Sequence, residues 1–163
     1  MQLYRFTEEQ ADVAVKKYRE HYAKRGVHEN KVYAGMESFL TEARKKGLSL
    51  YVATSKVITF ARQILDELGL SGYFRLIAGS MPDGSLSTKK AVIEYVIQEA
   101  GLTRLPEVIM VGDRKYDILG AKKAGVASAG VLYGYGSEEE LAKAGADYII
   151  PDIKALNSFF DVG

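Results

Sequence analysis

The chain has 163 residues, 47% apolar and 26% charged, which suits one globular domain or one domain with part of another. Its 22 basic and 21 acidic side chains nearly cancel, so nothing in the overall charge favours nucleic acid or an anionic membrane as a partner. The absence of cysteine excludes disulfides, thiolate catalysis and cysteine-bound metals. No apolar run has the length of a membrane span or resembles a signal peptide, so we expect a cytoplasmic protein.

The first 33 residues have a helical pattern. Thr7 and Gln10 fit a capping box, and apolar residues at positions 11, 15, 18 and 22 continue one helical face towards Gly26. A second helical segment, 35–47, follows without an intervening strand. We therefore expect 1–33 to be a piece of an all-helical element, set against an α/β part that spans 34–163.

After this segment, short apolar runs alternate with amphipathic ones. Buried strands are predicted at 48–54, 108–112, 128–133 and 147–151, with a weaker strand at 74–79. The intervening patterns predict helices. These helices are expected at 55–69, 88–101 and 137–145, the last opening with the capping box of Ser137 and Glu140. The alternation predicts an α/β fold, a Rossmann-like parallel sheet with helices on both faces.

Polar side chains follow the predicted strands at one edge of this sheet, where open α/β folds bind ligands. Hydroxyls beside the free amides of a helix start suit a phosphate, and a lysine offers positive charge to phosphoryl oxygens. Paired carboxylates are oxygen ligands for Mg²⁺. These residues are Thr54, Ser55, Lys89, Lys90, Asp113 and Asp117. Together they predict metal-assisted phosphoryl chemistry.

Each of these residues also has a purely structural explanation. Asp113 alone suits a helix N-cap, Thr54 and Ser55 suit caps as well, and either lysine alone suits a solvated helix start. The loop GYGS (134–137) lacks the third glycine of a dinucleotide loop and fits a turn followed by a cap, while GSLSTKK (84–90) lacks the second glycine of a P-loop. The convergence of all the candidate residues on one edge favours the phosphate site.

The motifs resemble those of the haloacid dehalogenase superfamily, especially its phosphoglycolate phosphatase-like and 5'-nucleotidase-like members. LYVATSK (50–56) resembles the second family motif and places its hydroxyl at Thr54. TKKAVI (88–93) resembles the third motif, with Lys89 as the favoured lysine and Lys90 as the fallback. VIMVGDRKYDILGAKKAG (108–125) resembles the fourth motif and places the acid pair at Asp113 and Asp117. Residues 18–26 resemble the last helix of the family's small helical cap, which makes 1–33 a cap remnant.

This resemblance implies a Mg²⁺-dependent phosphomonoester hydrolase that acts on a small phosphorylated metabolite. Thr54 and Lys89 would be catalytic and, with Ser55, would bind the phosphoryl group. Asp113 and Asp117 would hold Mg²⁺.

One family motif has no counterpart, because the sequence contains no Asp-x-Asp. In the family this motif ends the central strand of the sheet and supplies the attacking aspartate and the general acid. We therefore expect an N-terminally truncated chain that is inactive alone, with an incomplete core at 34–163 and exposed sheet edges through which copies could associate. Whether the chain is itself an enzyme stays open.

The alternative is a non-catalytic module that binds phosphate and Mg²⁺ or interacts through its edges. A phosphoacceptor signalling domain fits less well, because such domains carry their acids early and their lysine last, the reverse of the order here.

Overall fold

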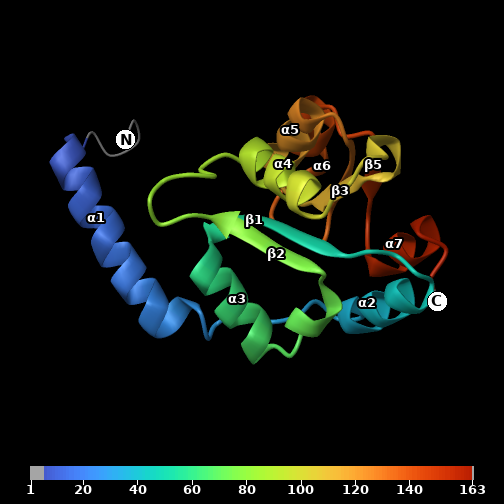
Figure 1. The fold of residues 1–163 in the computed structure, drawn as a ribbon, viewed down its shortest axis with the longest axis horizontal. Helices are drawn as coiled ribbons and strands as arrows, with labels where there is room; N and C mark the ends of the chain where they lie inside the picture. The colour runs from blue at the N-terminus through green and yellow to red at the C-terminus, as the bar shows by residue number, and fades with distance from the viewer. Residues whose placement is uncertain (1–5, 163) are drawn as a thin grey trace.

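The computed structural model of the chain describes residues 6–162 (Figure 1). Some side chains in the first helical segment lie outside this description: those of Glu8, Asp12, Tyr18, Arg19, Glu20, Ala23 and Lys24. Between residues 6 and 162 no helix is long and apolar enough to cross a membrane.

The N-terminal segment forms helix α1 (Glu8–His21), which continues into the π-helical turn η1 (Tyr22–Gly26). The predicted capping box is present, because the Gln10 N–H donates to Thr7 Oγ1 (3.2 Å) and the Thr7 N–H donates to Gln10 Oε1 (3.0 Å). Helix α1 projects away from the rest of the chain (Figure 1). Its predicted apolar face is exposed at Val15 (46%) but partly buried at Ala11 and Tyr22, and the predicted contribution of Tyr18 lies outside the described side chains. The assignment of 1–33 to a cap stays a prediction.

The strands form two parallel sheets. In the first, β1 (Tyr51–Val57) pairs with β2 (Leu76–Ser80). In the second, β4 (Ala127–Val131) lies between β3 (Ile109–Gly112) and β5 (Tyr148–Ile150). Every pairing is parallel, as predicted, but in the described chain β1 does not pair with β3. The sheet is thus divided between the two strands where the sequence lacks the expected central one.

Burial along the strands matches this division. All four residues of β3 and the first four of β1 are only partly buried, whereas β4 is buried at four of its five positions. In a complete parallel sheet the interior strands are covered on both faces. The two strands beside the division are therefore less enclosed than a strand further out.

Helices cover both faces of the sheets (Figure 1). Helices α3 (Ile58–Glu67) and α4 (Lys89–Glu99) lie on opposite faces of the β1–β2 pair. The remaining helices are α2 (Met36–Lys45), α5 (Lys115–Ala124), α6 (Glu138–Ala144) and α7 (Ile153–Phe159). Short 3₁₀ turns, η2 (Ser71–Tyr73) and η3 (Leu105–Glu107), precede β2 and β3. Neither these turns nor α7 was predicted from the sequence.

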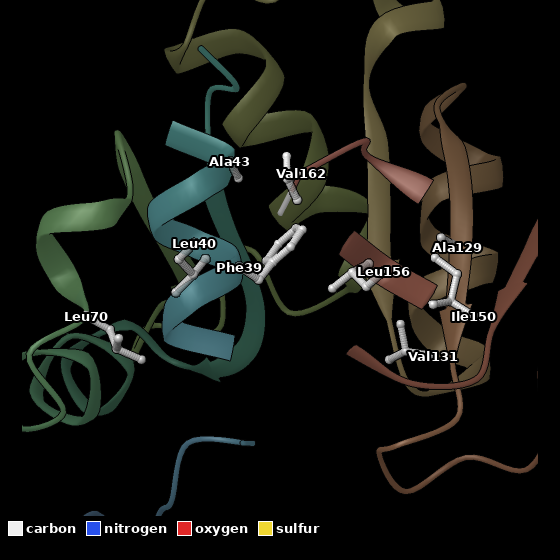
Figure 2. Close-up of a cluster of buried hydrophobic side chains, with 9 residues drawn as sticks. All are labelled: Phe39, Leu40, Ala43, Leu70, Ala129, Val131, Ile150, Leu156 and Val162. Atoms are coloured by element: carbon white, nitrogen blue, oxygen red, sulfur yellow. The ribbon is translucent and has the colours of Figure 1, made fainter. Parts of the chain in front are cut away.

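One apolar cluster holds the two sheets together (Figure 2). It contains Phe39 and Leu40 from α2, Ile150 from β5 and Leu156 from α7, which is 1% exposed. Half-buried side chains from both sides of the division pack against it. These are Leu48 and Leu50, which lead into β1, and Ile109 and Val111 of β3. Side-chain packing thus replaces the missing backbone pairing between the sheets.

The divided sheet generates a prediction about hydrogen exchange. Amides of β1 and β3 that point towards the division lack a strand partner, so we expect them to exchange faster than those of β4 by a factor of about ten or more, or about 1.4 kcal/mol in opening free energy. Residue-resolved exchange by NMR measures this difference. Equal protection along β1, β3 and β4 would mean that the two edges pair in solution.

Candidate active site

Thr54, Ser55 and Lys56 form a bulge in β1. Between the pairs Ala53–Ala78 and Val57–Ser80, these three residues of β1 lie opposite a single residue of β2, Gly79. Such bulges redirect side chains and are frequent beside functional sites. A Cβ on Gly79 would lie 2.5 Å from the Lys56 carbonyl oxygen, so glycine is what permits the bulge to approach β2.

The bulge corrects one sequence-based expectation. Thr54 and Ser55 were expected to begin a helix, but β1 continues to Val57 and α3 begins only at Ile58. The sequence pattern does not reveal the bulge, because Thr54, Ser55 and Lys56 are polar residues that suit the start of a helix equally well. Any phosphate bound here would meet amides of the bulge rather than of a helix N-terminus.

The Thr54 hydroxyl is positioned by the bulge itself. Its oxygen accepts a hydrogen bond from the Lys56 N–H (3.2 Å), which leaves the hydroxyl proton available for a ligand. Ser80, at the end of β2, donates to the Ser55 carbonyl oxygen (3.2 Å) and holds the outer part of the bulge. Thr54 is half-buried and Ser55 is exposed.

Lys89 connects the ends of the two sheets. Its Nζ donates to the Ala53 carbonyl oxygen in β1 (2.8 Å) and lies 2.9 Å from Asp117 Oδ1 in α5. Both charged side chains are close to fully buried, at 11% exposed for Lys89 and 10% for Asp117. The Lys89 stem crosses α5 at Gly120, where a Cβ would lie 2.6 Å from Lys89 Cγ.

Lys90 points elsewhere and pairs with Glu94 on the outer surface of α4 (3.0 Å). Of the two lysines that the sequence left open, the structure therefore brings Lys89 to the acid pair. Lys89 also contacts the residue directly before Thr54, so hydroxyl, lysine and Asp117 lie at one edge.

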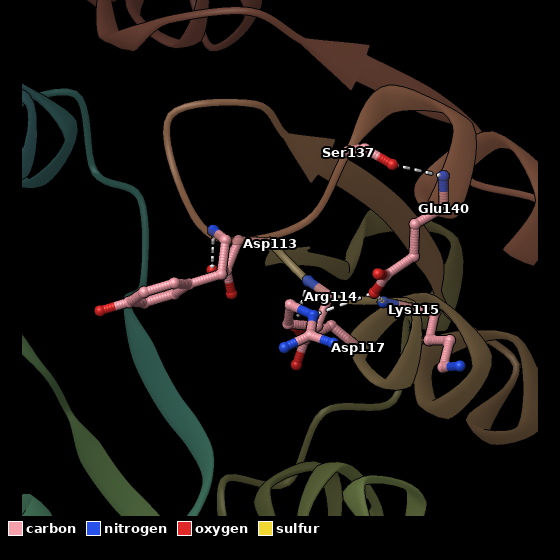
Figure 3. Close-up of polar contacts among 7 residues, drawn as sticks. Asp113, Arg114, Lys115, Asp117, Ser137 and Glu140 are labelled. Atoms are coloured by element: carbon pink, nitrogen blue, oxygen red, sulfur yellow. Dashed lines mark hydrogen bonds and ion pairs between the residues drawn. The ribbon is translucent and has the colours of Figure 1, made fainter.

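The two carboxylates make different contacts (Figure 3). Asp117 Oδ2 accepts the Arg114 N–H (3.0 Å) and so caps α5, while its Oδ1 faces Lys89. Asp113 Oδ2 accepts the Tyr135 N–H (2.8 Å) from the loop after β4. Since Arg114 is the N-cap residue of α5, the interpretation of Asp113 as a simple helix cap is wrong.

Three glycines pack directly against this acid pair. A Cβ on Gly112 would lie 2.6 Å from Asp117 Oδ2, and one on Gly134 would lie 2.6 Å from Asp113 Cγ. A Cβ on Gly136 would overlap the Asp113 carbonyl oxygen. The loop GYGS is thus a turn followed by the predicted Ser137 cap, and it also encloses Asp113, which the sequence did not indicate.

Glu140 was predicted only as part of a capping box. Its N–H does donate to Ser137 Oγ (3.1 Å), but its carboxylate binds the acid loop (Figure 3). Its Oε1 accepts from the Lys115 N–H (2.9 Å) and from Arg114 Nε (3.0 Å). The hydrogen bond from Lys115, followed by that from Arg114, lowers the pKa of Glu140, and Glu140 in turn raises the pKa of Arg114. A contact across 25 residues leaves no signal in the sequence pattern.

Two tyrosines stand beside Asp113. The rings of Tyr33 and Tyr133 meet edge to face with centroids 5.3 Å apart. Burial, helped by the negative charge of Asp113, raises the pKa of both, and the pKa of Tyr133 reaches about 12. Neither tyrosine stood out in the sequence, because Tyr33 lies in a linker and Tyr133 extends an apolar strand.

The N-terminal segment reaches the same edge through Tyr22. Its hydroxyl accepts a hydrogen bond from Lys56 Nζ (2.8 Å), and its ring lies 5.4 Å from that of Phe60 in α3. Tyr22 begins the π-helical turn, and such turns are frequent at functional sites. The bulge that carries Thr54 is therefore in contact with the helical segment.

The donor set fits Mg²⁺ with few protein ligands. The described residues contain no group of three or more acidic or histidine side chains that would cage a metal. Mg²⁺ commonly takes one or two carboxylates and completes its shell with water and phosphate oxygens. Asp113 has one oxygen outside its hydrogen bond to Tyr135, whereas both oxygens of Asp117 are engaged. Asp113 is thus the better placed ligand, with Asp117 as its support.

The glycine contacts predict that Gly134→Ala will displace the Asp113 carboxylate. We expect weaker Mg²⁺ binding and a loss of roughly 1–3 kcal/mol in unfolding free energy from overpacking. Gly72→Ala is the matched control, because a Cβ there meets nothing within 4 Å. Mg²⁺ titration by NMR and urea unfolding measure the two effects. Unchanged Mg²⁺ affinity in Gly134→Ala would argue against Asp113 as a ligand.

The raised pKa of Tyr133 predicts a loss of stability at high pH. The pKa of Tyr133 rises from its ordinary value of 10.0 to about 12 on folding. Between pH 10 and pH 12 the folded chain therefore retains a proton that the unfolded chain has released, so the free energy of unfolding is full below pH 10 and falls as the pH rises to 12. Absorbance titration of phenolates and urea unfolding across this range measure it, with Tyr133→Phe as the control. Asp113→Asn should leave most of the shift in place, because burial is its main cause.

Comparison with known proteins identifies the family of the chain. A family model described as haloacid dehalogenase-like hydrolase matches residues 1–131. The chain is 38% identical over 161 residues to a 5'-nucleotidase of Pseudomonas aeruginosa, a match that covers 99% of this chain and 72% of that protein. It is 38% identical over 136 residues to the tyrosine-protein kinase PtkA of Mycobacterium tuberculosis, and 31% identical over 125 residues to a phosphoglycolate phosphatase of Pseudomonas putida. These two matches cover 83% and 77% of this chain, and the chain spans just under half of each relative, 46% in both cases.

A solved structure extends the likeness to the fold. The crystal structure of a predicted phosphatase from Clostridium acetobutylicum superposes with a TM-score of 0.93 at 45% identity, over 98% of this chain and 73% of that one. The similarity in sequence and the similarity in fold thus each cover nearly the whole chain. The chain belongs to the haloacid dehalogenase-like hydrolase family.

Proposed function

We propose that the chain supplies the phosphate-binding and Mg²⁺-binding part of a phosphomonoester hydrolase. The observation that carries the proposal is the position of Lys89, which contacts both Asp117 and the carbonyl beside Thr54 at one sheet edge. A buried ammonium group at this position offers positive charge to an entering phosphoryl group. Family membership and the phosphatase and nucleotidase relatives support the same chemistry.

Each residue has a distinct role in this proposal. The Thr54 hydroxyl and the amides of the bulge at Ser55 donate hydrogen bonds to phosphoryl oxygens. Lys89 balances their charge. Asp113 would hold Mg²⁺ through its second oxygen, while Asp117 fixes Lys89 and the start of α5. When bound, Mg²⁺ would neutralise charge on the phosphoryl group and orient it.

The proposed substrate is a small phosphorylated metabolite. Phosphoglycolate and a nucleoside 5'-monophosphate are the two compounds that the names of the relatives favour. A third relative carries the name of a tyrosine kinase, which also performs phosphoryl transfer.

The attacking group is not among the residues of this edge. A covalent phosphoryl intermediate needs a carboxylate aimed at phosphorus, and the Asp-x-Asp motif that carries it in the family does not occur in the 163 residues. Both described carboxylates at the edge serve other partners. We therefore propose that this chain alone binds phosphate and Mg²⁺ without turning substrate over.

Hydrolysis of an aryl phosphate by the purified chain, with and without Mg²⁺, tests this proposal. We expect no turnover above an Asp113→Asn control, together with phosphate binding that Mg²⁺ strengthens in the unchanged chain and not in the variant. Mg²⁺-dependent turnover that Asp113→Asn abolishes would show that an attacking residue exists in the chain or in a second copy. Equal phosphate binding by both proteins would refute the metal role of Asp113.

A second candidate is a non-catalytic binding or interaction module. The observation that favours it is the pair of incompletely buried strands, β1 and β3, whose open edges would accept another strand or a second copy.

A peptide with an apolar strand that ends in Asp-x-Asp separates the two candidates. If its addition gives Mg²⁺-dependent hydrolysis, and the same peptide with asparagines does not, the chain is part of a hydrolase. A stable oligomer that excludes the peptide and binds phosphate without turnover would favour the module.

A further inference from the structure

A cavity lies at the opposite edge of the first sheet, before the amino ends of β1 and β2. Its volume is about 250 Å³. It is lined by residues 47, 48 and 50 ahead of β1, by residues 72–75 ahead of β2, and by Arg44 from the last turn of α2. The lining contains two arginines and no acidic side chain, although the whole chain is nearly neutral.

Arg44 is held in place by its surroundings. Its Nη1 donates to the Gly72 carbonyl oxygen (2.6 Å), and its guanidinium lies 6.0 Å from the centre of the Tyr73 ring. The Tyr73 hydroxyl is in turn 3.0 Å from Thr41 Oγ1. A guanidinium has five N–H donors, so most remain for a ligand. An arginine fixed in this way loses little rotamer freedom when it binds an anion.

Arg75 is exposed, and its side chain makes no hydrogen bond or ion pair with any described residue. Its backbone is fixed, because its N–H donates to the Leu50 carbonyl oxygen (2.9 Å). The acids nearest in sequence already have partners. Glu42 pairs with Lys45, Glu67 pairs with His28, and Asp83 accepts a hydrogen bond from the Ser85 hydroxyl. No acidic group of the lining neutralises the second arginine.

Attraction to the C-terminal end of α2 does not account for the arginine pair. The last carbonyls of this helix accept hydrogen bonds from backbone amides, with the Lys46 N–H on Glu42, the Gly47 N–H on Arg44 and the Leu48 N–H on Ala43. These acceptors are therefore satisfied without a cation.

We propose that this cavity is a second anion site, which binds a small doubly charged oxyanion such as phosphate or a compact phosphate monoester. Arginine matches the geometry of phosphate oxygens, which supports this class of ligand. The size also fits, because about 250 Å³ lies just below the roughly 300–1,000 Å³ of pockets for drug-sized ligands and so suits a smaller ligand. The half-buried Leu48 and Phe74 leave room for a short apolar part of the ligand.

The cavity is distinct from the candidate active site. Leu50 and Thr54 are four residues apart along an extended segment, which corresponds to roughly 13 Å between the two edges. A ligand here would contact residues that lead into both β1 and β2, the pair that carries Thr54 and Ser80. The inference does not depend on the proposed function, because none of the cavity residues belongs to the phosphoryl edge.

Titration of the purified chain with inorganic phosphate, followed by amide NMR, tests the proposal. We expect two sets of responding amides, one at residues 54–56 and 112–115 and another at Gly47 and Gly72. Arg75→Gln should weaken the response at Gly47 and Gly72 by about tenfold or more, because a charge-assisted hydrogen bond is lost. Arg62→Gln is the matched control, since Arg62 is also exposed and makes no hydrogen bond or ion pair with the described residues. Asp113→Asn should leave the second set unchanged.

Two outcomes would overturn the proposal. One is the absence of a response at Gly47 and Gly72 up to about 50 mM phosphate. The other is an unchanged affinity at these amides in Arg75→Gln. Loss of the response at residues 54–56 alone would bear on the active site and not on this cavity, so the two proposals fail separately.

Discussion

The buried ion pair between Lys89 and Asp117 is the contact on which the candidate site depends. The lysine begins in α4, crosses α5 at Gly120 and ends between the two sheets, where it also binds the Ala53 carbonyl oxygen. Removal of one partner from a buried pair typically costs about 3–5 kcal/mol, because the other charge is left uncompensated. In a chain whose sheet is divided, the same pair positions the proposed phosphate-binding edge and connects β1 to α5, which follows β3. A substitution of Lys89 would therefore change both the proposed site and the stability of the fold.

The two sheets are separated at the position where the expected central strand, with its Asp-x-Asp motif, is missing from the sequence. The apolar cluster around Phe39 and Leu156 reaches across the division, so the halves stay together through side chains while backbone groups on facing strands stay unpaired. Packing is non-directional and tolerates a missing neighbour, whereas hydrogen bonding between strands does not. This difference explains how the chain retains its family's arrangement, with a TM-score of 0.93 to one solved relative, although it covers only part of that protein.

Much of the fold could be predicted from the sequence, because apolar runs, helical spacing and caps are local signals. The Thr7 and Ser137 caps and the strand before Asp113 are examples. The bulge at Thr54 could not, because it depends on the register between β1 and β2. Nor could the choice of Lys89 over Lys90, which is decided by the direction of each side chain and by the space above Gly120. Glu140 and the tyrosine pair reach the site through contacts distant in sequence, for which a periodic pattern carries no information.

Two of the glycines around the acid pair imply an order in which this candidate site could be lost. Gly112 and Gly134 are required by the side chains of Asp117 and Asp113 rather than by unusual backbone angles. As long as the aspartates remain, a larger residue at either glycine is penalised. Because the nearest atom to such a residue is the aspartate's own Cβ, 2.3 Å away at both glycines, only replacement of the aspartate by glycine removes the penalty. A larger neighbour that then fills the space obstructs the return of the acid. Loss of the acid would therefore be difficult to reverse, and the present sequence retains both aspartates and both of these glycines.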